Sequence, residues 1–357
     1  MKCTKSFSFQ KREIANYQSI HAHQLLPLNL HIKNGGAHLY RHGIILFSTL
    51  DDKPAKRNYF YHPLFIFLME VLYFSRSLIS LFVSTFNRQY FVYAGDYMYF
   101  IGAKTHINIA ATQYMLVGIN ILSLNLMRYL HNQEPDFVRA IDFLWGKRTA
   151  AEAGLRNRKY IYTFINQSRT LSNFSGINTK LVMLVSFVMS ILPIATNVTL
   201  REFLLFGLPW SIVFAISSHH TFSSYYLNMS YFYILCHLFK FRLRELADTI
   251  CQTKSKPTWT KLAQLKLEYK SVEEEVTHFN NTYWSTYLFV VVFFISTFNN
   301  VVLYAALFVD MVFVVKMSLY YSCTLSCLLI FSVMSTAATV YHEAERCRLS
   351  CYRVDRR

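Results

Sequence analysis

The sequence predicts an all-α fold, a polytopic transmembrane helical bundle, and three observations lead to it. Apolar residues make up 53% of the chain and charged residues 16%, against about a quarter in soluble domains. The mean hydropathy is +0.23. The formal net charge of +16 is spread between long apolar runs, which argues against a compact nucleic-acid-binding domain. The apolar excess therefore has to face a lipid bilayer.

A membrane-spanning helix needs about 20 mostly apolar residues. Six stretches meet this requirement: residues 64–86, 106–130, 181–197, 211–239, 284–308 and 317–340. The fourth lies in an apolar run of 37 residues, 203–239, which is too long for one span. Because Gly207 and Pro209 interrupt this run, we expect the helix to begin near Ser211, after an outer, re-entrant segment.

Lysine and arginine residues concentrate on one side of the predicted spans. The segment before the first span holds nine, loops 131–180 and 240–281 hold eight each, and the residues after Tyr341 hold five, whereas the alternate loops hold four together. Because basic loops stay in the cytoplasm, we expect a plasma-membrane protein with both termini cytoplasmic. The chain then divides into a basic segment (1–63), the transmembrane bundle (64–341) and a charged tail (342–357).

The loop 240–281 contains the pattern of an amphipathic helix. Between residues 258 and 281, apolar side chains recur at spacings of three and four: Leu262, Leu265, Tyr269, Val272, Val276 and Phe279. Two interpretations are open: a helix packed on its own subunit or on the bilayer, and a helix that extends the fifth span and meets neighbouring subunits. At the start of the same loop, Lys240, Arg242 and Arg244 are interpreted as an anchor to lipid phosphates.

No catalytic, cofactor-binding or metal-binding pattern stands out. The chain lacks a Gly-rich phosphate loop and the GxSxG and HExxH motifs, and its histidines fit no zinc template. We therefore expect no enzyme activity, no cofactor and no metal. Ionisable residues inside spans carry more information, because burying them in lipid is costly. Glu70 and Arg76, both in the first span, are expected to pair with other spans.

Polar and aromatic side chains gather at a similar depth in several predicted spans, in or near the outer half of the bilayer. The candidate ligand-binding residues at this depth are Asn108, Gln113, Trp210, His219, Asn299, Asn300, Tyr304 and Tyr320. An aromatic cavity with a few polar groups is typical of a small-molecule site. The alternative is that these residues only pack and hydrogen-bond between helices.

Three stretches resemble the arthropod gustatory receptors. Residues 231–250 (YFYILCHLFKFRLRELADTI) are similar to that family's fourth span and the basic helix after it. Residues 267–308, with the sequence FNNTYW at 279–284, are similar to the approach to its fifth span, and residues 337–347 to the exit from its sixth. The similarity extends over residues 64–347 and is strongest after residue 225.

The resemblance implies a gustatory-type chemoreceptor, a subunit of a tetrameric ligand-gated cation channel. It implies a small-molecule tastant bound in the outer half of the helices, and cytoplasmic helices that anchor the subunits to one another. It also implies a seventh, pore-lining span with a Thr-Tyr…Gln-Phe signature. The 16 residues after Tyr341 are charged and too few to cross a membrane, so no pore residue is carried over from the family.

Two other classes of membrane protein are open. A secondary transporter would show inverted repeats with Gly- or Pro-broken spans at matching positions, whereas here only the fourth span is expected to be broken. A G-protein-coupled receptor would place its N-terminus outside the cell, opposite to the side that the distribution of Lys and Arg predicts.

Overall fold

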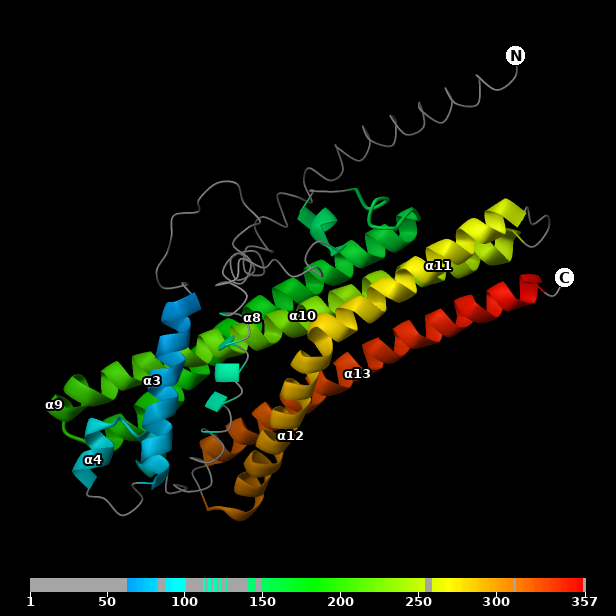
Figure 1. Cartoon of the computed structure of the whole chain (residues 1–357). Coiled ribbons are helices and arrows are strands. Elements are labelled where there is room, and N and C mark those ends of the chain that lie inside the picture. The colour runs from blue at the N-terminus through cyan, green and yellow to red at the C-terminus, as the bar shows by residue number, and fades with distance from the viewer. Residues whose placement is uncertain are drawn as a thin grey trace.

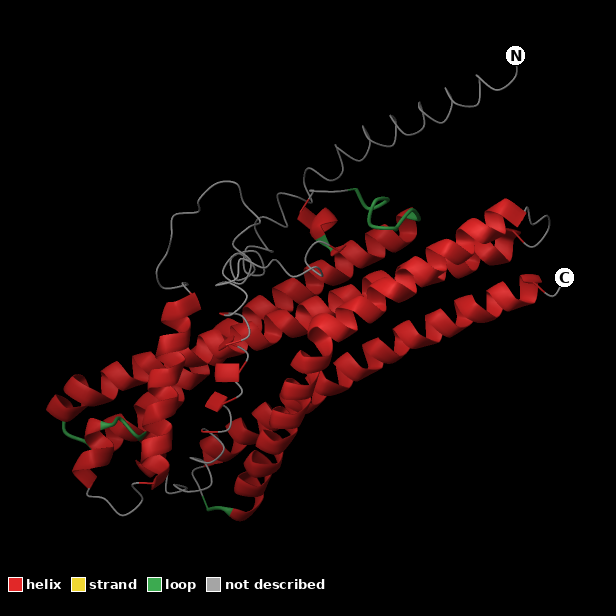
Figure 2. Ribbon diagram, viewed as in Figure 1, coloured by secondary structure: helices red, strands yellow, loops and turns green. Residues whose placement is uncertain are grey.

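A computed structural model describes residues 63–82, 88–100, 140–145, 149–253, 259–310 and 313–355, with single residues and short stretches between 112 and 126. The regular structure in these ranges is helical (Figure 2). Four helices among them are long and apolar enough to cross a membrane: Arg158–Asn197, Leu200–Gln252, Ser285–Phe308 and Leu319–Tyr352. The predicted all-α bundle is thus confirmed for spans three to six. The predicted second span lies mostly outside the described residues.

Helix α10 (Leu208–Thr253) is the centre of the bundle (Figure 1). Helices α8 (Arg158–Asn197) and α13 (Phe313–Asp355) pack along it, and α3 (Pro63–Phe82) and α11 (Trp259–Phe279) also contact it. Helix α12 (Ser285–Phe308) packs on α13. We call the end where α10, α11 and α13 meet the basic end, and the end where α4 (Arg88–Tyr93) and α9 (Leu200–Glu202) lie the loop end.

The three longest helices extend well beyond the thickness of a bilayer. Helices α8, α10 and α13 contain 40, 46 and 43 residues. At about 1.5 Å per residue they are about 60–70 Å long, roughly twice the ~30 Å hydrocarbon core. Residues 158–180, residues 240–253 and the tail up to Asp355 are therefore continuations of these helices, and α11 forms most of the rest of loop 240–281.

The expected break before the fourth span is wrong. A π-helical turn, η3 (Phe203–Gly207), joins α9 to α10 without interruption. Gly207 serves helix packing, because a Cβ atom there would lie 2.7 Å from Cγ2 of Ile194 on α8. Pro209 lies in the first turn of α10, next to the wide π turn, where its missing N–H is tolerated.

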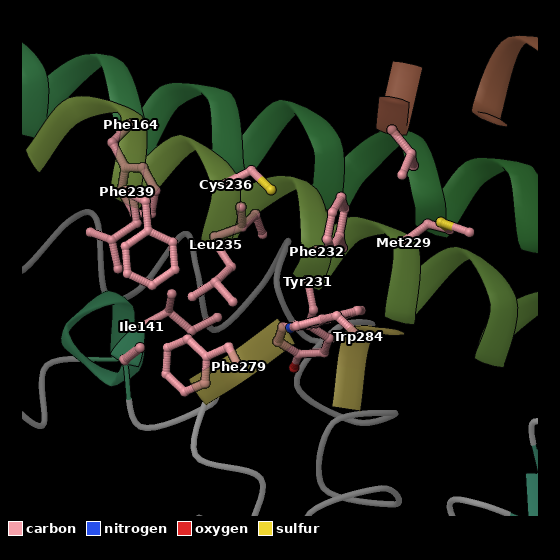
Figure 3. Packing of buried hydrophobic residues seen from close by; sticks show 14 of the residues in the cluster. Ile141, Phe164, Met229, Tyr231, Phe232, Leu235, Cys236, Phe239, Phe279 and Trp284 are labelled. Carbon is pink, nitrogen blue, oxygen red and sulfur yellow. The ribbon is translucent and has the colours of Figure 1, made fainter. Parts of the chain in front are cut away.

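The core runs along α10 (Figure 3). Phe232 of α10 meets Trp284 edge-on, with 5.0 Å between ring centroids, and Phe239 lies 5.8 Å from Phe279 of α11. Cys236, between these two positions, is buried in the same cluster. Aromatic side chains such as these fill the buried cluster where α8, α10 and α11 come together.

The predicted apolar seam of α11 is confirmed. Leu262, Leu265, Val272 and Phe279 are buried, and Tyr269 and Val276 are partly buried against the core. A second π-helical turn, η4 (Asn280–Trp284), connects α11 to α12. Helix α11 therefore both extends the fifth span and packs on its own chain.

Candidate functional site

The structure describes six of the eight predicted ligand-binding residues and distributes them over different surfaces. Asn108 and Gln113 lie outside the described residues. Trp210 and His219 are on α10, while Asn299, Asn300 and Tyr304 are on α12 and Tyr320 is on α13.

Trp210 belongs to a polar and aromatic network at the loop end. Its Nε1 donates a hydrogen bond to the carbonyl oxygen of Tyr93 at 3.1 Å. The guanidinium of Arg76 lies 5.5 Å from the centre of the Trp210 ring and 4.5 Å from that of Tyr73. Such contacts between a cation and an aromatic face gain strength away from water.

Arg76 ties α3 to the short turn that follows α4. Its Nη1 donates to the carbonyl oxygens of Ala94 and Gly95 at 3.0 and 2.8 Å, and its Nη2 donates to Tyr73 Oη at 3.1 Å. Gly95 has φ +57°, and a Cβ atom there would lie 2.4 Å from Cβ of Trp210. The glycine thus lets the turn close over the indole. The expectation that Arg76 meets another span is met by its contact with Trp210 of α10.

His219 is buried between α10 and α8. Its ring hydrogen-bonds to the backbone of Thr179 on α8, and it lies 5.4 Å from the ring of His220. The imidazole therefore links these two helices. To bind a ligand through this ring, His219 would have to give up its hydrogen bond to Thr179.

The remaining four predicted residues lie on α12 and α13. Nδ2 of Asn299 contacts Sγ of Cys327 at 3.6 Å, and Tyr320 Oη donates to the carbonyl oxygen of Ala306 at 3.2 Å. Asn300 is exposed because it lies 100° around the helix from its neighbour. Tyr304 is half exposed and packs on Phe308, with 5.1 Å between ring centroids. Asn299 and Tyr320 thus share one interface, and Asn300 and Tyr304 face outward.

Glu70 is a buried ionisable residue that the predicted site did not include. Its side chain on α3 is 0% exposed, and its Oε2 accepts a hydrogen bond from Ser217 Oγ on α10. Sδ of Met115 lies 3.9 Å from the same hydroxyl. The signal was present in the sequence, because a carboxyl group within an apolar span is rare and usually functional. The expectation that Glu70 pairs with another span is confirmed.

No family model matches the chain, and no curated protein matches it either. Its fold does match a solved structure, the insect olfactory receptor OR5 from Machilis hrabei. The two align over 92% of this chain and 90% of the receptor, with a TM-score of 0.59 and 15% sequence identity. The chain has the fold of an insect olfactory receptor. With at least four candidate spans, it is a multi-pass membrane protein.

In this olfactory-receptor fold, ion pairs connect three long helices at the basic end. Arg242 of α10 pairs with Glu275 of α11 at 2.6 Å. Arg244, also on α10, lies 3.8 Å from Glu343 of α13. The two arginines expected to contact lipid phosphates therefore face acidic partners in their own chain, because α11 and α13 extend alongside α10 beyond the apolar spans.

Proposed function

We propose that this protein is a gustatory-type chemoreceptor, a subunit of a ligand-gated cation channel that senses small molecules at the plasma membrane. The observation that carries the proposal is the alignment of 92% of the chain with an insect olfactory receptor fold. The resemblance of residues 231–250, 267–308 and 337–347 to gustatory receptors supports the taste-type branch.

The proposed ligand is a small molecule that binds in the outer half of the bundle. Trp210, His219, Asn299 and Tyr320 line helix interfaces in the described part of the chain, and Asn108 and Gln113 belong to the predicted second span. Indole, imidazole, amide and phenol groups combine apolar surface with hydrogen-bonding atoms, which suits small polar organic ligands. Asn300 and Tyr304 face outward in this conformation and would join the site only after a rotation of α12.

The subunits are proposed to assemble as a tetramer through their basic ends. Helices α10 and α13 are longer than a bilayer is thick, and α11 packs beside the part of α10 that extends beyond it, which provides protein surface for such an assembly. Both termini are proposed to lie in the cytoplasm, because that side carries nearly all of the Lys and Arg residues.

Whole-cell recording tests the proposal. The chain is expressed in cells and exposed to panels of sugars and bitter compounds. Ligand-evoked cation current, reduced by Trp210→Ala, is the expected result. Tyr162→Ala, which removes an exposed aromatic side chain on α8, is the matched control that leaves the current unchanged.

Two outcomes would replace the proposal with another function. Saturable substrate uptake without current would identify a secondary transporter. A ligand response that needs G proteins, together with an N-terminus accessible from outside the cell, would identify a G-protein-coupled receptor.

A further inference from the structure

The interface of α3 and α10 buries a carboxyl group that has no basic partner among the described residues. Glu70 is 0% exposed, and its carboxyl group lies beside two hydroxyls, those of Ser217 and Thr221. Arg76, on the same helix, uses its guanidinium for carbonyl groups, Tyr73 and Trp210. A carboxylate removed from water needs a counter-charge, either a cation or a proton.

Several oxygen atoms converge on one place beside this carboxyl group. Ser217 and Thr221 are one helical turn apart on α10, and Ser217 donates to Oε2. The other carboxyl oxygen, Oε1, lies beside Oγ1 of Thr221, and neither has a hydrogen-bond partner of good geometry. A Cβ atom at Gly118 would lie 2.7 Å from Oε1 and 2.8 Å from Oγ1 of Thr221. Both oxygens therefore lie closely packed against the backbone of Gly118, where any larger side chain would collide with them.

Hydroxyl groups around this interface behave differently from those elsewhere in the bundle. Many helical Ser and Thr side chains donate to a carbonyl one turn earlier, as Ser190 does to Phe187 on α8 and Thr336 does to Ser332 on α13. The buried hydroxyls of Ser77 and Ser80 on α3, and of Ser211, Ser218 and Ser223 on α10, make no such bond. Buried hydroxyls that keep their lone pairs and protons available are the groups that hold ordered water or a bound ion.

We propose that the Glu70 carboxylate, with the hydroxyls of Ser217 and Thr221, binds a small monovalent cation inside the helical bundle, with Na⁺ as the probe. Carboxylate and hydroxyl oxygens are the ligands that hard cations prefer, and ordered water completes the coordination. The bound cation supplies the missing counter-charge and fastens α3 to α10. This site is independent of the proposed chemoreceptor function.

Binding of ²²Na⁺ to the purified full-length protein in detergent tests this site. The expected result is saturable binding that Glu70→Gln weakens by at least about tenfold, since a lost charged contact is worth at least about 1.4 kcal/mol. Thr221→Val keeps the side-chain shape, removes only the hydroxyl and is expected to weaken binding by a smaller factor. Ser190→Ala, which removes a buried hydroxyl already bonded to its own helix, is the matched control and leaves binding unchanged.

Thermal unfolding of the same samples gives a second readout. Na⁺ is expected to raise the melting temperature of the wild type and of Ser190→Ala, but not of Glu70→Gln, while choline at equal ionic strength has no effect. The inference is overturned if Glu70→Gln binds ²²Na⁺ as the wild type does. It is also overturned if stability responds to pH and not to Na⁺, because the carboxyl group then carries a proton instead of a cation.

Discussion

Arg76, Gly95 and Trp210 form a contact at the loop end in which each residue depends on the others. Replacing Gly95 by Ala would force a side chain onto φ +57° and against the indole. We expect Gly95→Ala to destabilise the protein by more than about 1 kcal/mol, seen as a lower melting temperature in detergent. Gly176→Ala, inside α8, serves as the control and should hold or raise it, since Ala is the better helix former. Equal effects of the two substitutions would show that the turn does not need a glycine.

The ion pair of Arg242 and Glu275 at the basic end offers a comparison between partly buried and exposed pairs. The side chains of Arg242 and Glu275 are 15% and 30% exposed, whereas those of Lys270 and Glu274 are 70% and 68% exposed. We expect Arg242→Ala to cost about 1–2 kcal/mol after allowance for solvent screening, and Lys270→Ala at most about 0.5 kcal/mol. Melting temperatures of the two variants measure the difference. A larger loss from Lys270→Ala would contradict this ranking.

At the scale of elements, two leucines of α11 test which face of this helix is buried. Leu265 is 6% exposed and Leu267, two residues later, is 69% exposed. Leu265→Ala is expected to destabilise the protein by about 2–5 kcal/mol because it leaves a cavity among Leu246, Ala247 and Cys347. Leu267→Ala, with the same chemical change, should cost less than about 0.5 kcal/mol. Similar melting temperatures of the two variants would mean that α11 does not pack in this register.

The helices themselves could be predicted from periodicity, but their ends and joints could not. Spacings of three and four identified α11 because burial selects apolar residues on one face. Hydropathy alone did not reveal that α8 and α13 continue past the apolar spans, since their charged ends read as loops, whereas residues 231–250 already indicated a basic helix after the fourth span, as α10 has it. Gly207 and Pro209 were taken as a break because a π-helical turn has no simple sequence signal.

At the scale of the whole molecule, the orientation in the membrane can be measured directly. Asn197 and Asn166 each begin an Asn-X-Ser/Thr glycosylation motif. Both are exposed on α8, Asn197 at the loop end and Asn166 towards the basic end. With both termini in the cytoplasm, glycosylation should occur at Asn197 and not at Asn166. A glycosidase-sensitive gel shift that Asn197→Gln abolishes and Asn166→Gln leaves intact is the expected result. Glycosylation at Asn166 and not at Asn197 would show that both termini lie outside the cytoplasm.

The sequence located the candidate site only in part. Depth along each span could be estimated, and Asn299 and Tyr320 do lie at one interface, that of α12 and α13, although each contacts a different residue there, Cys327 and Ala306. Rotation about each helix could not be estimated, and Asn300 consequently faces outward. The partners of Glu70 were also beyond prediction, because the contact with Ser217 joins residues 147 positions apart in the chain.

The unbroken path from η3 through α10 has a mechanical consequence. A helix of 46 residues acts as a stiff lever whose arm is about 70 Å. If this helix pivots about one end by about 5°, its other end moves by about 6 Å, which is more than the 5.4 Å rise of one helical turn. Arg242 and Arg244, which pair with α11 and α13, lie about 50 Å along this lever from its start, so the same pivot moves them by about 4–5 Å while Trp210, close to the pivot, hardly moves.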